Sequence, residues 1–176
     1  VVCAHKALTT KDVASGISAS ISALLTQSGV SKKQIDAIMI GTTQFTNAVV
    51  ERRNLSEVGV IRIALPSGNG CPPMCNWPKD LADAMGHHVY ECHGGYLYDG
   101  YPVAEINEGE VDAVVDDIRR KGLDVVAISS AFSTMNAQPE QMFREKLIQA
   151  MPDVRVTMSH QIGSLGLLER ENAAIL

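Results

Sequence analysis

Residues 124–132 read DVVAISSAF, and this stretch carries the plainest signal for the fold. The run is almost continuously apolar, whereas a strand with one face in water would alternate apolar and polar residues. A strand of this kind is buried on both faces, which is typical of a parallel sheet with helices on each side. The stretch therefore predicts an α/β domain.

Helices are predicted on both sides of this strand. Asn107 and Glu110 form the capping signal of a helix whose valines and Ile118 recur on one face, and Gly122 ends it. The elements predicted after the strand are a helix over about 138–150, a strand from Val154 to Met158 and an apolar helix from about Gly166. This alternation favours one α/β domain over residues 1–176.

The N-terminal half repeats the alternation. A Thr-x-x-Asp signal at Thr9 to Asp12 starts an amphipathic helix that Gly29 ends, and Ser31 with Gln34 forms a second capping box. The other predicted helices run to about Arg52 and from Pro78 to near Gly86. The predicted strands are residues 1–8 (VVCAHKAL), Ala37 to Ile40, Glu57 to Ile63 and 88–92 (HVYEC). Residues 64–78 hold four prolines and predict a long loop, within an excursion from the main sheet over about 64–105.

Composition limits the classes of function. With 45% hydrophobic residues the chain can bury a real core, and no window approaches the roughly 18 apolar residues of a membrane span. A net charge of −5 without a basic, aromatic stripe disfavours nucleic acid, so we expect small-molecule or protein partners, no membrane and reduced cysteines in a cytoplasm. Because the chain opens with Val1-Val2-Cys3 in what reads as the middle of a strand, we expect a fragment.

Residues 41–51, GTTQFTNAVVE, form the first candidate site. Gly41 lets the backbone turn closely, and Thr42, Thr43, Thr46 and Asn47 offer hydroxyls and an amide beside the free N–H groups of a helix start. Ligands collect at the carboxyl ends of strands in open α/β sheets, so this junction suits an anion or a polar substrate. The alternative is that one threonine caps the helix and the rest satisfy the local backbone.

A second junction follows the strand that opened this section and carries Ser129, Ser130, Phe132, Ser133 and Asn136. It could share a cleft with the first, although such serines more often only cap the next helix. The chain has neither a G-x-x-x-x-G-K-[ST] nor a G-x-G-x-x-G loop for a nucleotide phosphate.

Three further patterns favour structural readings. The thiols and imidazoles of Cys71, Cys75, His87, His88, Cys92 and His93 lack the paired C-x₂-C spacing of a zinc site, so no metal is predicted and the question stays open. GGYLYDG favours a tight hairpin with a turn at Asp99-Gly100 over a ligand site. Ser159 and His160 would point to opposite faces of a strand, so no Ser–His couple is expected.

Taken in order, the stretches KALTTKDVASGI, IGTTQFTNAVVERR, GGYLYDG, AISSAFSTMN with Glu140, and SHQIGSLGLLERENAAIL resemble the N-terminal domain of the hydantoinase/oxoprolinase family. The resemblance spans nearly the whole chain, and GTT-x-x-TNA-x-x-ER is its most specific part. The family includes ATP-dependent N-methylhydantoinase and 5-oxoprolinase subunits and related acetone and acetophenone carboxylase subunits.

The resemblance implies a ribonuclease H-like domain of the actin, sugar-kinase and heat-shock ATPase type. It implies an enzyme that uses ATP and Mg²⁺ to open a cyclic amide, of hydantoin or 5-oxoproline type, by phosphorylating the carbonyl oxygen. An ATP-dependent acetone- or acetophenone-type carboxylase subunit and a non-metabolic actin-like nucleotide-binding domain stay open. A hydantoinase B-type subunit or fused domain is the implied partner, and a homo-oligomer is allowed.

The implied cleft is lined by Gly41, Thr42, Thr43, Thr46, Asn47 and Glu51, with Ser130, Ser133 and Asn136 as further binding residues; no catalytic residue is identified. The resemblance puts the phosphate hairpin and the second nucleotide-binding lobe outside these residues, so the fragment alone is expected to be inactive. Two departures weaken the substrate assignment: Pro139 stands where the family often has histidine, and Gln161 where it often has glutamate.

Overall fold

The structure is a computed structural model that describes residues 1–176 except 9, 11, 40, 42 and 165. It divides into two compact units, Val1–Thr43 and Gln44–Leu176. The predicted single domain over 1–176 stays a prediction. Among the residues described, no helix is both long enough and apolar enough to cross a membrane.

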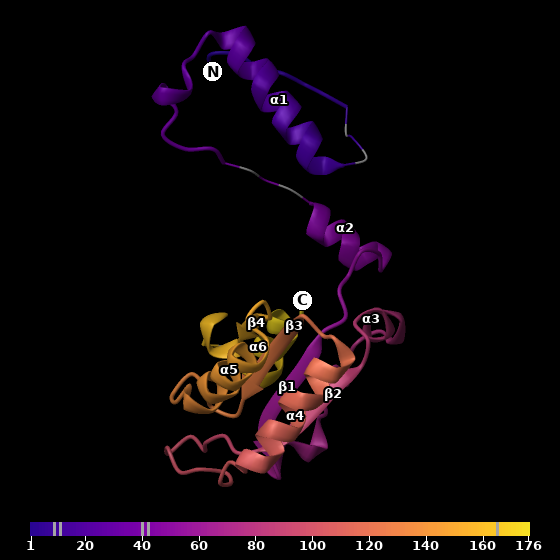
Figure 1. Cartoon of the computed structure of the whole chain (residues 1–176), viewed down its shortest axis with the longest axis vertical. Helices are drawn as coiled ribbons and strands as arrows, with labels where there is room; N and C mark the ends of the chain where they lie inside the picture. Colours follow the sequence, from indigo (N-terminus) through magenta and orange to yellow (C-terminus); the bar gives the residue numbers. More distant parts are fainter. Residues whose placement is uncertain (9, 11, 40, 42, 165) are drawn as a thin grey trace. The chain divides into compact units, whose positions relative to one another are not determined.

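The larger unit is built on a parallel sheet. Its strands are β1 (Gly59–Leu65), β2 (His88–His93), β3 (Val125–Ser130) and β4 (Arg155–Met158), in the order β2-β1-β3-β4 (Figure 1). All three pairings are parallel, which confirms the predicted α/β class. β2 lies on one side of β1, and β3 and β4 lie on the other side. The strand order therefore reverses between β1 and β3, and this is the point at which open sheets bind ligands.

Helices cover both faces of this sheet. The covering helices are α3 (Lys79–Ala84), α4 (Glu108–Lys121), α5 (Gln138–Ala150) and α6 (Leu167–Ile175). The helix α2 (Gln44–Glu51) belongs to the same unit but has no buried residue. Ile61, Ile128 and Phe143 belong to the core under α4 and α5, whereas Val60 and Ala174 belong to the core on the α3 and α6 side. Because successive strand residues face opposite sides, β3 needs apolar residues at nearly every position, as the sequence predicted.

The ends of α4 test the capping prediction. Asn107 accepts hydrogen bonds from the backbone N–H groups of Gly109 and Glu110, and Gly122 closes the helix at φ 69°. The prediction is wrong for the side chain of Glu110, which instead accepts from the backbone N–H of His93 at 2.9 Å. Because the carboxylate of Glu110 lies close to the end of β2, it accepts from the backbone there and not from the first turn of its own helix.

The excursion between β1 and α4 is held by short local structures. A 3₁₀ helix, η2 (Ser67–Gly70), lies within the predicted loop, and α3 follows Pro78 as expected. Tyr96 and Pro102 form an antiparallel bridge, and the backbone N–H of Leu97 donates to the oxygen of Tyr101 at 2.7 Å. Gly100 has φ 87°, so GGYLYDG is the tight turn that the structural reading favoured.

The smaller unit contains α1 (Val13–Ser28) and the 3₁₀ helix η1 (Lys32–Gln34). Asp12 is the N-cap of α1, and Gly29 is its left-handed C-cap with φ 66°. The predicted capping box of Ser31 and Gln34 is present. Thr9 and Lys11 of the predicted start signal lie outside the described residues.

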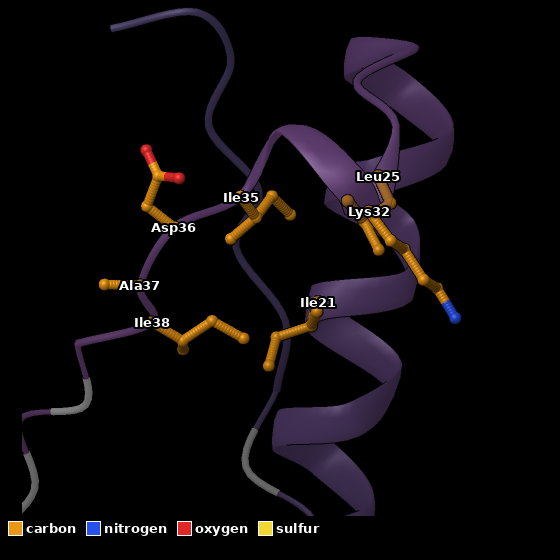
Figure 2. A pocket seen from close by; sticks show the side chains of 7 residues that line it. All are labelled: Ile21, Leu25, Lys32, Ile35, Asp36, Ala37 and Ile38. Atoms are coloured by element: carbon orange, nitrogen blue, oxygen red, sulfur yellow. The ribbon is translucent and has the colours of Figure 1, made fainter.

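The two strands predicted in this unit are wrong. Residues 1–8 and Ala37 to Met39 form no strand, and Ile40 lies outside the described residues. An apolar segment becomes a strand only when a neighbouring strand takes its backbone hydrogen bonds, and the described part of this unit contains no strand. Figure 2 shows Ile35 and Ile38 pointing toward Ile21 of α1. No residue of α1 is buried, so its apolar face is only partly covered.

Candidate functional site

The GTT segment is exposed. Gly41 and Thr43 are exposed in the smaller unit, and Thr42 lies outside the described residues. Gly41 borders a cavity of about 670 Å³ that is lined mainly by apolar residues of the N-terminal segment and of α1. Nothing in these surroundings tests a role in binding, so this part of the site stays a prediction.

The predicted residues of α2 are exposed as well. Thr46, Asn47 and Glu51 lie on this helix in the larger unit, and Glu51 is 3.9 Å from Arg53 in a solvated ion pair. The next residue, Arg52, pairs with Asp80 at 3.0 Å. Arg52 therefore holds the end of α2 to the α3 region, and the binding role of the other three side chains stays a prediction.

Two predicted residues at and just after the end of β3, Ser130 and Ser133, contact a buried arginine of α6. Arg170 is 3% exposed, and its Nη2 donates to the backbone oxygen of Ser130 and to the Oγ of Ser133, both at 3.1 Å. The α6 helix packs on β3, which brings Arg170 to the carboxyl end of that strand. The third predicted residue, Asn136, uses its Oδ1 to accept from the backbone N–H of Gln138 at 3.0 Å, while the N-cap of α5 is Ala137, which makes no side-chain cap.

A fully buried glutamate lies beside this arginine. Glu140 in α5 accepts from the Oγ of Ser159 and from the Nδ1 of His160, both at 2.6 Å, and from the backbone N–H of His160 at 3.2 Å. An ionised carboxylate can only accept, so Nδ1 of His160 carries a proton in this contact. Ser159 and His160 lie in the 3₁₀ helix η3 (Ser159–Gln161), not in a strand. The assumed strand geometry was wrong, and the two residues meet through Glu140.

Hydroxyls join the two charged residues into one network. The Oγ of Ser159 is 3.3 Å from the Oγ of Ser133 and accepts from Nε of Arg170 at 3.4 Å. Burial lowers the pKa of Arg170, and the negative charges of Glu140 and Glu169 oppose this shift. The Arg170–Glu140 network comprises Ser130, Ser133, Glu140, Ser159, His160 and Arg170. It therefore balances a buried cation against a buried anion at the carboxyl ends of β3 and β4.

A cavity of about 350 Å³ opens beside this network. Its lining residues are Ala131, Phe132, Thr134, Ser164, Gly166, Leu167 and Arg170. Phe132 has φ 51°, a left-handed conformation that costs a bulky residue about 1–3 kcal/mol. We name this space the Arg170 cavity.

The side chain of Ser129, another residue of the predicted cluster, lies on the face of the sheet opposite to the side chain of Ser130. Its Oγ donates to Oε2 of Glu171 at 2.6 Å, and Nε of Arg62 donates to the same oxygen at 2.7 Å. Arg62 and Glu171 are each 1% exposed, so they form a buried ion pair between β1 and α6. This pair supports the attachment of α6 and is separate from the Arg170 cavity.

The sequence interpretation missed the charged members of both groups. Glu140 lies at helical spacing from Phe143 and Leu147, and all three are buried on one face of α5. Glu171 and Ile175 share a face of α6 in the same way. A charged residue on the apolar face of a helix is the signal that could have identified these positions.

The thiols and imidazoles are dispersed. Among the residues described, no three His, Cys, Asp or Glu side chains are placed to hold a metal ion. His87 pairs with Asp83, His88 with Glu57 and His93 with Glu110. Cys92 is fully buried, whereas Cys71 and Cys75 are exposed.

Comparison with known proteins gives a family and a fold. The family model described as hydantoinase/oxoprolinase N-terminal region matches residues 1–151. The ATP-dependent caprolactamase of Pseudomonas jessenii is 20% identical with a TM-score of 0.66, over 91% of this chain and 25% of that one. Nucleotide-free acetone carboxylase is 16% identical with a TM-score of 0.71, over 96% and 27%. The chain spans about a quarter of these solved chains, and at such identities the likeness shows the fold alone. No curated protein matches.

Proposed function

Because this chain belongs to the hydantoinase/oxoprolinase family, we propose that it is part of an ATP-dependent enzyme that opens a cyclic amide of hydantoin or 5-oxoproline type. The family match over residues 1–151 carries this proposal. The likeness to an ATP-dependent caprolactamase supports it at the level of the fold, and the Arg170–Glu140 network supplies buried polar groups where α/β sheets bind ligands. The proposed fold type is ribonuclease H-like.

The proposed chemistry overcomes the low reactivity of an amide carbonyl toward water. Transfer of the terminal phosphoryl group of ATP to the carbonyl oxygen makes the carbonyl carbon more electrophilic. A water molecule attacks this carbon, and the C–N bond then breaks to leave an acyl phosphate. A second water attacks the same carbon and breaks its bond to the bridging oxygen, so phosphate leaves with the former carbonyl oxygen and a carboxylate remains. Positioning and charge stabilisation dominate such transfers.

The roles proposed for this chain are binding and orientation. Thr42, Thr43, Thr46 and Asn47 orient the acceptor oxygen or the terminal phosphate. Gly41 allows close approach, and Glu51 or Arg52 holds the loop or the substrate. Ser130, Ser133 and Asn136 are proposed to bind the substrate or the phosphate. No set of acidic side chains among the residues described is placed for Mg²⁺, so no step is routed through the metal within this chain.

An isotope experiment tests this function. The complete enzyme that carries this chain, with its hydantoinase B-type partner or domain, is given MgATP and a cyclic amide labelled with ¹⁸O at its carbonyl. We expect stimulated phosphate release and the label in phosphate. Label that stays wholly in the carboxylate product would overturn the proposed transfer to oxygen, and the unlabelled amide with labelled water is the control.

The carboxylase is the second candidate, because acetone carboxylase shares the fold over 96% of this chain. Replacing the amide with a ketone and bicarbonate in the same assay separates the two reactions. Stimulation by ketone and bicarbonate alone would select the carboxylase. A rate of phosphate release that none of these substrates changes would instead favour a non-metabolic, actin-like nucleotide-binding protein.

A further inference from the structure

We propose that the Arg170 cavity binds the uncharged ring of a small cyclic amide, and that it favours a simple lactam or hydantoin over 5-oxoproline. This inference rests on the proposed function for the substrate class and narrows that class by charge. The residues that line this cavity differ from those of the GTT segment, to which the family resemblance assigned the substrate.

The lining of the cavity matches such a ring in size and chemistry. Its volume of about 350 Å³ lies near the lower end of the roughly 300–1,000 Å³ of small-molecule sites. Phe132 and Leu167 offer apolar surface for methylene groups. Thr134 and Ser164 are exposed lining residues whose hydroxyls can serve an amide N–H or carbonyl. An amide needs both a donor and an acceptor, and hydroxyls supply both.

Arg170 is held in place before any ligand arrives. Its guanidinium partners include the oxygen of Ser130 and the hydroxyls of Ser133 and Ser159, and Glu140 in turn holds Ser159. A side chain that is already ordered loses little entropy on binding, so its positive charge can favour a carbonyl oxygen at low cost.

The charge around the cavity decides between neutral and anionic ligands. The carboxylate of Glu169 lies against Gly166, a lining residue, so closely that a side chain at Gly166 would collide with its Oε2. Glu140 and Glu169 both act electrostatically on Arg170. The two carboxylates therefore already offset part of this positive charge, and a ligand carboxylate or phosphate near Gly166 would meet the negative charge of Glu169. A neutral ring avoids this repulsion.

Ligand titrations of this 176-residue chain, followed by backbone NMR, test the inference. We expect caprolactam and hydantoin to shift the signals of Ala131, Thr134 and Leu167, with 5-oxoproline and inorganic phosphate at least tenfold weaker. Absence of shifts at these residues with the neutral ligands, or equal binding of phosphate, would overturn the inference.

Matched variants sharpen the test. Thr134→Val removes one exposed hydroxyl and should weaken caprolactam binding by about 2- to 12-fold, the range for one hydrogen bond, whereas Thr157→Val in β4 should leave it unchanged. Glu169→Gln should bring 5-oxoproline closer to the neutral ligands. An unchanged preference in Glu169→Gln would refute the charge argument.

The two proposals fail separately. A complete enzyme that places the carbonyl label in phosphate while this chain shows no binding at the Arg170 cavity would retain the proposed function and reject this site. Binding of neutral rings at the cavity in an enzyme that does not turn over cyclic amides would reject the proposed function and retain the site.

Discussion

The two faces of the sheet are stabilised by different physics. Under α4 and α5, Ile61, Ile128 and Phe143 are fully buried in an apolar core. On the α6 side, Arg62 lies next to Ile61 in β1 and is equally buried, but it is paired with Glu171. Apolar burial has no direction, whereas a buried ion pair requires both partners in one geometry. The α6 side also has an apolar core, which includes Val60 and Ala174, but unlike the core that contains Ile61 it depends in addition on the matched charges of Arg62 and Glu171.

The largest effect is expected from breaking the buried pair. Glu171→Ala leaves the guanidinium of Arg62 buried without its carboxylate and removes the acceptor of Ser129. The free energy of unfolding, measured by urea denaturation, should fall by about 3–5 kcal/mol. Glu145→Ala on the exposed side of α5 is the control and should change it by less than about 0.5 kcal/mol.

A double variant shows whether uncompensated charge is the cause. Arg62→Met combined with Glu171→Leu removes both charges and keeps apolar volume, so it should recover most of the lost stability. A double variant as unstable as Glu171→Ala alone would mean that the pair supplies geometry that apolar side chains cannot replace.

The next effect is a pH dependence on the apolar face. Burial, reinforced by Glu110 and Glu91, raises the pKa of Cys92 from 9.0 to about 12. The unfolded chain loses this proton above about pH 9 while the folded chain keeps it, so the free energy of unfolding should fall as pH rises from 9 toward 12, by at most about 1.4 kcal/mol per pH unit. Cys92→Ala should lack this part of the slope. Equal slopes for the two proteins in urea denaturation across this range would contradict the assignment.

The smallest change in the free energy of unfolding is expected from shortening one apolar side chain under α4 and α5. Ile61→Val removes one buried methylene beside Arg62 and should cost about 0.5–1.5 kcal/mol, because neighbouring side chains relax partly into the space. A loss as large as that of Glu171→Ala, in the same urea experiment, would remove the contrast between the two faces.

Local patterns were enough to predict most of the larger unit. The bounds of α5 at 138–150, the buried strand 125–130 and the caps at Asn107 and Gly122 depend on residues close in sequence. Residues 1–8 and 37–39 looked equally strand-like, yet a strand needs a hydrogen-bonded neighbour, which no local pattern reveals.

The site was predictable only in part for the same reason. Ser130 and Ser133 were found because they follow a recognisable strand. Their partner Arg170 lies about 40 residues away in the sequence, and its distance from Glu140 depends on how α5 and α6 pack. Sequence spacing can place a charge on a buried helix face, but only the tertiary structure shows which charge it meets.

The backbone at Phe132 has a consequence for how the sequence can change. A left-handed conformation suits glycine or asparagine better than phenylalanine. In a mutational scan selected only for folded protein, glycine should therefore be enriched at position 132. If the scan is selected for lactam binding, an aromatic ring should be retained there, and the difference between the two selections would measure what the ring contributes beyond stability.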